Sequence, residues 1–238
     1  VVNSSCVLSA DGSHAYLVSR DGKLHVLAIS DGDSRDADAS SRIAEERVVD
    51  LGLTGCACVP TMHDGKLIVG GEANGSAALA IIDLNDDFAT TLITTADGSQ
   101  LTAGVLGGIK GAPLVNAQAD GSTYVYFTVN YGETSDFVNY TSGGGVYRYK
   151  LGDTEASGVF SATGHYNCCD SPIACDAKGN LYYINDSGVL FKLNAGMKVS
   201  FNTGEGSKVD FQTTAANGSV AKPADPTREG YTFAGWYT

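Results

Sequence analysis

Four stretches of the chain share one pattern of hydrophobic and polar positions. Each begins with a small residue or proline and a short apolar run, which leads into a turn. An alternating run follows, then a second glycine-containing turn and another alternating run that ends in Asp, Asn or Gly. Alternation of this kind predicts half-buried β-strands. The four units are residues 6–32, 58–86, 112–131 (resuming at 143–153) and 171–196.

The turns and the segments between the units complete this pattern. The first turns are Asp11-Gly12, Asp64-Gly65, Asp120-Gly121 and Lys178-Gly179, where glycine supplies the positive φ that tight hairpins need. Residues 45–53, 90–95 and 157–164 could each form a fourth, outer strand, and only short stretches such as 41–49 could form a helix. Four antiparallel strands recurring at roughly 55 residues predict the blades of a β-propeller. An irregular β-sandwich is the alternative.

In detail, the units resemble the repeats of the quinoprotein-like (pyrroloquinoline-quinone-type) propeller family, and residues 172–193 match its blade pattern best. We therefore expect an all-β protein with a propeller of about four visible four-stranded blades over residues 1–196. Their approximate limits are 1–50, 51–105, 106–162 and 163–196. The fourth unit lacks an obvious outer strand before Met197. Either the N-terminal residues close the ring, or earlier blades precede this chain; we expect the second.

The last segment has a different sequence pattern from the four units. A V-x-F run is followed by a glycine-rich turn and later by K-P-x-x-P-x-x-x-G-Y-x-F-x-G-W, which ends at Trp236. Residues 197–238 thereby resemble the Listeria–Bacteroides (internalin B-type) repeat. The resemblance implies part of a small β-grasp-like module in which Trp236 packs in the core. Such repeats occur in secreted or wall-attached proteins of bacteria, which implies a Gram-positive, cell-wall-associated surface protein.

The composition narrows the partners. Hydrophobic residues make up 43% of the 238 residues and charged residues 18%, as in globular proteins. The net charge of -12 repels phosphate backbones and anionic lipids, so we expect no nucleic-acid partner. No apolar run approaches the roughly 20 residues of a membrane span, so we expect no membrane insertion in this segment.

The cysteines suggest an oxidising compartment. Their number is even, and the spacings C-x-C and C-C-x5-C differ from those of zinc sites. We therefore favour disulfides over metal binding, with the connectivity left open. The candidates are Cys6, Cys56, Cys58, Cys168, Cys169 and Cys175.

One motif raises the question of catalysis. Cys168, Cys169 and Asp170 are similar to the "CCD" of quinoprotein alcohol dehydrogenases, whose adjacent cysteines form a disulfide against the quinone. Those enzymes lay the quinone on a tryptophan, and residues 1–235 contain none. We therefore expect structural cysteines, with no catalytic or cofactor-binding residues.

Two loops are candidates for binding. Asp31, Asp33, Asp36 and Asp38 could hold Ca²⁺ through carboxylate oxygens, although the EF-hand order is not met and a solvated acidic loop is the plainer interpretation. We therefore expect no cofactor unless this loop holds calcium. The insertion at 132–145 is either a ligand-binding loop or a long hairpin. Its aromatic candidates are Tyr131, Phe137 and Tyr140.

Together these features predict a secreted bacterial cell-surface protein. Its propeller would bind a host or cell-surface protein or glycan without catalysis, and repeat modules would carry it. The alternatives are a fragment of a quinone- or metal-dependent oxidoreductase and a purely structural spacer.

Overall fold

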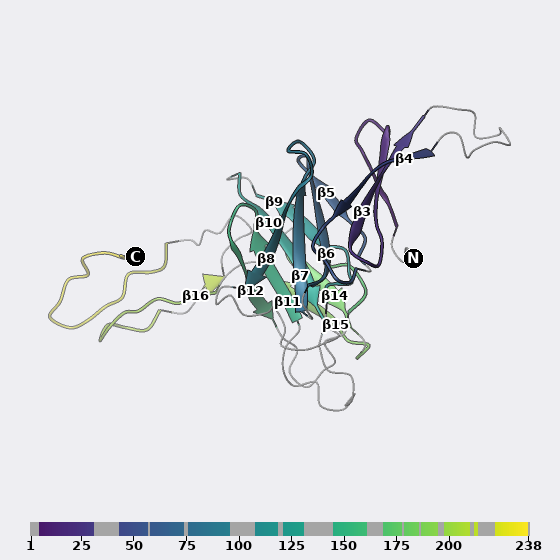
Figure 1. Cartoon of the computed structure of the whole chain (residues 1–238). Coiled ribbons are helices and arrows are strands. Elements are labelled where there is room, and N and C mark those ends of the chain that lie inside the picture. Colours follow the sequence, from purple (N-terminus) through teal and green to yellow (C-terminus); the bar gives the residue numbers. More distant parts are fainter. Residues whose placement is uncertain are drawn as a thin grey trace.

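The computed structural model shows a chain of β-strands, turns and irregular segments (Figure 1). It describes residues 5–30, 43–56, 58–73, 76–95, 108–118, 121–130, 145–160, 169–177, 179–185, 187–194, 198–209, 212–213 and 222–237. No residue in these ranges is helical. Within the same ranges, therefore, no helix is long and apolar enough to cross a membrane.

The strands fall into the four units that the sequence predicts. The first unit has β1 (Val7–Leu8), β2 (His14–Val18), β3 (Lys23–Ile29) and β4 (Ile43–Asp50). The second has β5 (Thr61–His63), β6 (Lys66–Ala73), β7 (Ser76–Asp83) and β8 (Ala89–Thr95), and the third has β9 (Leu114–Ala117), β10 (Thr123–Val129), β11 (Gly145–Lys150) and β12 (Glu155–Phe160). The fourth contains β13 (Ala174–Cys175), β14 (Asn180–Ile184) and β15 (Leu190–Asn194). Within each unit, consecutive strands pair antiparallel, which is the meander of a propeller blade.

The local predictions for the turns and outer strands are confirmed. Gly12, Gly65, Gly121 and Gly179 have φ values of 73°, 69°, 86° and 83°, in the left-handed region that favours glycine. The three outer strands are present as β4, β8 and β12. A helix at 41–49 is wrong, because residues 43–50 pair with β3 along its whole length.

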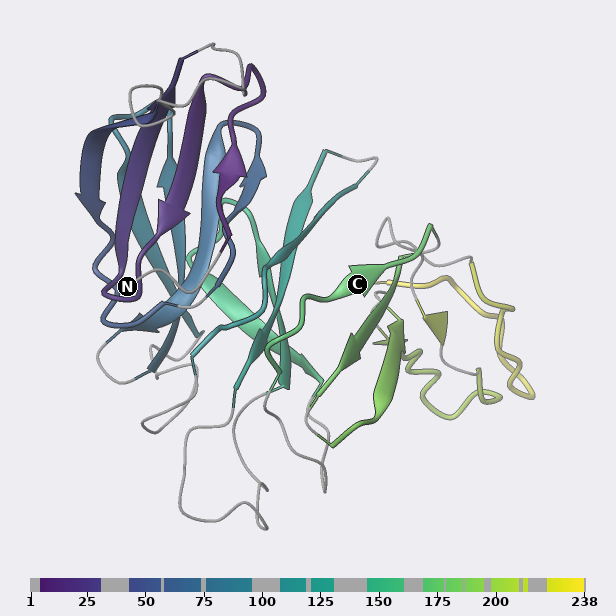
Figure 2. The ribbon, with the colours of Figure 1, turned by 90° about the vertical axis from the view of Figure 1, so that its right-hand side faces the viewer.

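The second and third units are joined more closely than separate blades would be. β8 and β12 pair in parallel through Thr94 with Glu155 and Thr95 with Ala156, so that β5 to β12 form one eight-stranded sheet. In Figure 2 the first unit (purple) and the fourth (green) lie on opposite sides of this sheet. The protein is therefore all-β and built from propeller-type blades arranged as a stack.

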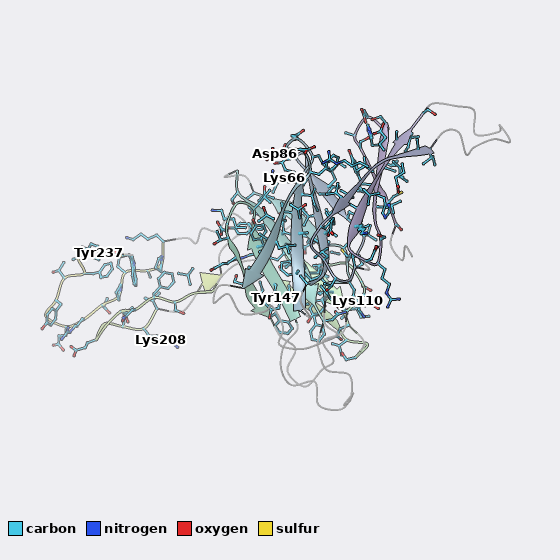
Figure 3. All side chains as sticks on the ribbon, viewed as in Figure 1. Lys66, Asp86, Lys110, Tyr147, Lys208 and Tyr237 are labelled. Carbon is cyan, nitrogen blue, oxygen red and sulfur yellow. The ribbon has the colours of Figure 1, made fainter. Side chains whose placement is uncertain are left out.

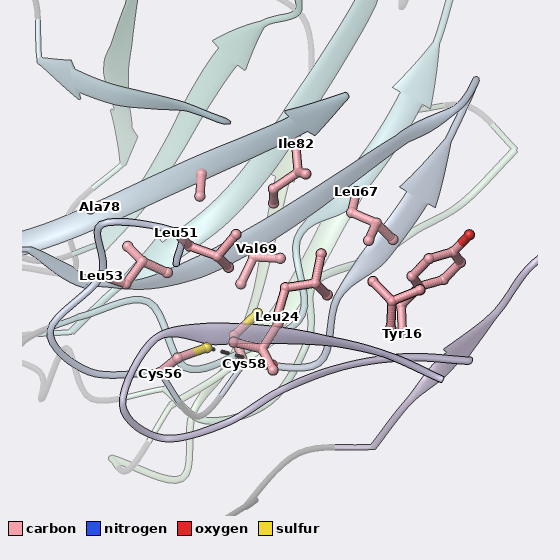
Figure 4. Packing of buried hydrophobic residues seen from close by; sticks show 13 residues of the cluster. Tyr16, Leu24, Leu51, Leu53, Cys56, Cys58, Leu67, Val69, Ala78 and Ile82 are labelled. Carbon is pink, nitrogen blue, oxygen red and sulfur yellow. Dashed lines mark hydrogen bonds between the residues drawn. The ribbon is translucent and has the colours of Figure 1, made fainter. Parts of the chain in front are cut away.

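The second and third units contribute side chains to the junctions on both of their faces. Residues of β6 alternate, so that Leu67 and Val69 pack against the first unit (Figure 4), whereas Ile68 packs against the third. On β10, Val125 and Phe127 face the second unit and Tyr126 faces the fourth. Three hydrophobic clusters thus lie between four units, one at each junction.

All units are stacked in the same orientation. The direction of a side chain on the second strand of a unit follows from the hydrogen bonds of its backbone. Where the backbone groups bond to the first strand of the same unit, the side chain points to the next unit along the chain. In β2 this set includes Tyr16 and Val18, and in β10 it includes Tyr126. The same rule assigns Ile68 of β6 to the junction with the third unit, as observed. At each junction, therefore, the face that points to the next unit along the chain packs against the face of that unit that points back.

The buried cysteines belong to these junctions as thiols and not as disulfides. Cys56 and Cys58 lie in the first cluster and Cys169 in the third, while Cys6 and Cys175 are exposed. The thiols of Cys56 and Cys58 point to different acceptors, the carbonyls of Gly70 (3.1 Å) and Val59 (3.1 Å). No disulfide joins these five described cysteines, so the disulfide prediction is not supported for them; Cys168 lies outside the described residues.

The C-terminal segment extends away from the sheets (yellow in Figure 1). It has a short pair of strands, β16 (Lys198–Val199) and β17 (Gln212–Thr213). The Trp236 ring lies 5.2 Å from Phe201 and 5.1 Å from Phe233, centroid to centroid. Ser207 N donates to Thr227 O (2.8 Å), which ties the motif that ends at Trp236 to the glycine-rich turn. Trp236 is therefore a packing residue of this segment.

The junction between the first two units can be tested at Gly22. Its φ is 77°, and a Cβ there would clash with the carbonyl oxygen of Leu53, on the segment that leads into the second unit. Gly22→Ala should lower the free energy of unfolding by roughly 2 to 4 kcal/mol, through backbone strain and overpacking. Gly12→Ala is the matched control, because Gly12 has a φ of 73° and a Cβ added there would meet nothing within 4 Å. The control should cost about 1 kcal/mol in urea unfolding. Equal losses in the two variants would mean that the close approach at Leu53 does not exist.

The buried thiols predict a loss of stability in alkaline solution. Burial raises the pKa of Cys56 from 9.0 to about 11 and that of Cys58 to about 12. Because the folded pKa lies above the unfolded one, this contribution to stability is complete below pH 9 and is lost as the pH rises towards 11. For Cys56 the loss by pH 11 is about 2 kcal/mol. Unfolding by urea at several pH values should therefore show a shallower decline in Cys56→Ala than in the wild type; parallel curves would contradict the burial of this thiol.

Candidate functional site

A cleft lies at one end of the strands, where the segments that connect the units cross. In Figure 3, Lys110 marks this end, and Lys66 and Asp86 mark the other. The volume of the cleft is about 650 Å³. The ends of β2 and β6 and the two segments that connect the first three units contribute to it. Its lining residues are Arg20, Asp21, Thr54, Gly55, Cys56, Gly71, Glu72, Gly108, Ile109 and Lys110.

Backbone hydrogen bonds fix the walls of the cleft. Cys56 N donates to Arg20 O (3.0 Å), and Ile109 N donates to Gly71 O (3.2 Å). Each connecting segment is thereby bound to the end of the second strand of the preceding unit. Cys169 N makes the corresponding contact in the third junction, to Asn130 Oδ1 (2.8 Å). The repeat of the fold therefore creates the cleft.

Glu72 is held in place by its backbone and by two glycines. Glu72 N donates to Gly55 O (2.7 Å), and Thr54 N donates to Glu72 O (2.7 Å). A Cβ at Gly108 would lie 2.7 Å from Glu72 Cγ, and one at Gly55 would lie 3.4 Å from Glu72 Oε2. The absence of side chains at these positions leaves room for the Glu72 side chain between the two connecting segments.

The charged groups of the cleft differ in how far they are neutralised. Asp21 accepts from Ser19 Oγ (2.5 Å), which lowers the pKa of the Asp21 carboxyl. Lys110 Nζ lies 3.7 Å from Asp170 Oδ1. The side chains of Arg20 and Glu72 have no ion pair or hydrogen bond to any residue in the described part of the chain. As far as the described residues show, the cleft thus contains a guanidinium and a carboxylate without a partner.

The predicted binding loops cannot be placed. Asp31, Asp33, Asp36 and Asp38 lie outside the described residues, as do Tyr131, Phe137 and Tyr140. Among the residues that are described, no three His, Cys, Asp or Glu side chains are grouped so that they could hold a metal ion. The calcium loop and the aromatic loop therefore remain predictions.

The "CCD" motif falls at the third junction. Cys169 is 2% exposed, and its thiol donates to Ile184 O (3.0 Å). Cys169 forms no disulfide, in contrast to the paired cysteines of the quinoprotein alcohol dehydrogenases that this motif resembles. Its partner in the motif, Cys168, is not among the described residues.

Sequence reasoning missed the charged residues of the cleft. Arg20, Glu72 and Lys110 come from three units and form no motif along the chain. One signal was present: Arg20 and Glu72 both stand at the end of the second strand of a unit, close to the second turn. Aligning the units and inspecting the residues at that end would have brought them together.

A second hollow lies beside Trp236. It has a volume of about 720 Å³, and its apolar lining includes Val199, Phe201, Pro223 and Phe233. Tyr237, also on its edge, is 82% exposed. This groove belongs to the packing of the C-terminal segment, and Lys222 on its lining forms an ion pair with Asp225 (3.0 Å).

Comparisons with known proteins identify one part of the chain. Residues 198–238 match the family model of the Listeria-Bacteroides repeat domain. The comparison with curated proteins gives no match. Among solved structures, BamB from Moraxella catarrhalis is 15% identical in sequence, with a TM-score of 0.38. The match covers 94% of this chain and 74% of the BamB chain. An endo-arabinase from Bacteroides thetaiotaomicron is 13% identical with a TM-score of 0.36, covering 98% of this chain and 94% of its own. The chain thus combines stacked propeller-type units with a segment that resembles the Listeria-Bacteroides repeat domain.

Proposed function

We propose that this chain is a ligand-binding part of a bacterial surface protein, and that the cleft between its first three units binds an acidic glycan. The observation that carries the proposal is that one cleft brings together Arg20 and Glu72, two charged side chains with no ion-pair partner among the described residues. No catalytic residue is proposed.

The chemistry of the lining favours a ligand with a carboxylate and several hydroxyl groups. A guanidinium binds a carboxylate through two parallel hydrogen bonds. Lys110, whose ammonium lies 3.7 Å from Asp170 Oδ1, also lines the cleft. The Glu72 carboxylate only accepts hydrogen bonds, so it suits the hydroxyl groups of a sugar. A glycan that carries a uronic or sialic acid supplies both kinds of group.

The proposed location follows from the C-terminal segment. Residues 198–238 match a repeat domain that is found in surface proteins. Such a repeat would hold the stacked units away from the cell, where the cleft could reach glycans of a host or of neighbouring cells. Secretion, attachment to a Gram-positive cell wall and a role in adhesion are parts of this proposal.

The proposal predicts selective binding that depends on two side chains. Isothermal titration with an oligosaccharide containing glucuronic acid should give measurable affinity, whereas the matching neutral oligosaccharide should bind at least about tenfold more weakly, because the contact to Arg20 is lost. Arg20→Ala should abolish this preference. Glu72→Gln should weaken binding of both sugars by a similar factor.

Matched controls exist on the same stack. Lys150→Ala and Glu155→Gln change exposed charges of the third unit that do not line the cleft, and they should leave binding unchanged. Circular dichroism would show that each variant is folded. If the wild type bound neither sugar, or if the control variants lost binding as much as the cleft variants, the cleft would not be the glycan site and the structural-spacer hypothesis would gain support.

A further inference from the structure

The stack ends in two faces that have no neighbouring unit among the described residues, and these faces are of opposite kinds. The outer face of the first unit is here called the front face. It corresponds to the face with which each of the other units contacts the unit before it. The outer face of the fourth unit, the rear face, is the kind that packs against a following unit. The assignment follows from the common orientation of the units, since Tyr182 and Ile184 occupy on β14 the role that Tyr126 has on β10.

The front face carries aliphatic side chains that are largely open to solvent. Strand register places Leu17 beside His25 and His25 beside Val48 on this face, with Leu27 beside Glu45. Leu8 is 54% exposed, Ile43 55% and Val48 45%. The equivalent side of the second unit carries Leu67 and Val69, both fully buried by the first unit.

The rear face is similar in character. Ile184 pairs with Leu190, and they are 44% and 68% exposed. Tyr182 pairs with Lys192, whose ammonium lies over the Tyr182 ring at 5.7 Å. On the third unit the equivalent face carries Tyr126, which is 3% exposed because the fourth unit covers it.

Each face carries charges of both signs: Lys23 and Asp50 pair on the front face, and the Tyr182 hydroxyl of the rear face donates to Asp176 (3.0 Å). The front face carries Glu45, half-exposed beside His25 (2.6 Å between Oε2 and Nδ1). The rear face carries the exposed ammonium of Lys192. An approach of Glu45 on one copy to Lys192 on another would bring opposite charges together.

We propose that these faces bind each other between two copies of this chain, with the rear face of one copy against the front face of the next. The contact would continue the sheet-on-sheet packing that occurs three times within the chain. A head-to-tail interface of this type either closes into a ring or extends into a longer array, depending on the rotation between copies. It is independent of the proposed glycan site, which lies at the end of the strands and on neither of these faces.

Sedimentation velocity of the full chain, from low micromolar to submillimolar concentration, tests the proposal. The wild type should self-associate reversibly as the concentration rises. Val48→Lys on the front face and Leu190→Lys on the rear face should each weaken self-association by at least roughly tenfold, because a lysine would be buried at the contact. Both side chains are exposed in the single chain, so both variants should fold, which thermal melting would verify.

Mixing the two variants distinguishes a head-to-tail contact from other modes. The Val48→Lys variant keeps an intact rear face and the Leu190→Lys variant keeps an intact front face, so an equimolar mixture should form a heterodimer. Lys150→Ala serves as a control that lies on neither face. A wild type that stays monomeric throughout would overturn the proposal, as would self-association that both variants retain. Association that is lost in each variant and not restored by mixing would point to a contact between like faces and would also overturn it.

Discussion

The structure depends on one constraint: a sheet that is apolar on both faces must be covered on both. β6 and β7 of the second unit bury Leu67, Ile68, Leu79 and Ile82 completely, and their side chains alternate between the two neighbouring units. A four-stranded meander of this composition cannot be stable alone in water, because one of its apolar faces would remain exposed. Stacking in one orientation covers each face with the next unit, and the three hydrophobic clusters follow from it.

The same constraint produces the candidate site. To bring the next unit onto its face, the chain must cross from the outer strand of one unit to the inner strand of the following one. These crossings are bound to the preceding unit by backbone hydrogen bonds, at Arg20 and at Gly71. Glycines at 55, 71 and 108 let the crossing segments approach, and the space that remains receives Arg20, Glu72 and Lys110. The cleft is thus a consequence of stacking, and it brings together Arg20 and Glu72, whose side chains have no partner within the described ranges.

Much of the fold could be predicted from alternation and turn chemistry, because both are local. The four glycine turns have the positive φ that hairpins require, and the outer strands occur where apolar residues lie between the units. The pairing of β8 with β12 could not be predicted, since it involves only Thr94, Thr95, Glu155 and Ala156 and depends on how two units lie in space. The disulfide prediction was not supported, for a similar reason. Their number suggested disulfides, but the structure uses Cys56, Cys58 and Cys169 as small buried hydrophobic residues at the junctions. The site residues were missed because charges at positions 20, 72 and 110 meet only when three units are stacked.

Amide hydrogen exchange, read by mass spectrometry at a concentration where the chain is monomeric, tests the stacking most directly. The account predicts that the amides of β6 and β7 and those of β10 and β11, in the two units covered on both faces, exchange most slowly. Those of β2 and β3 and of β14 and β15, in units covered on one face only, should exchange faster, because they can open without disrupting two junctions. Protection of the second unit no greater than that of the first and fourth would contradict the account, since it would mean that the units do not stabilise one another through their faces.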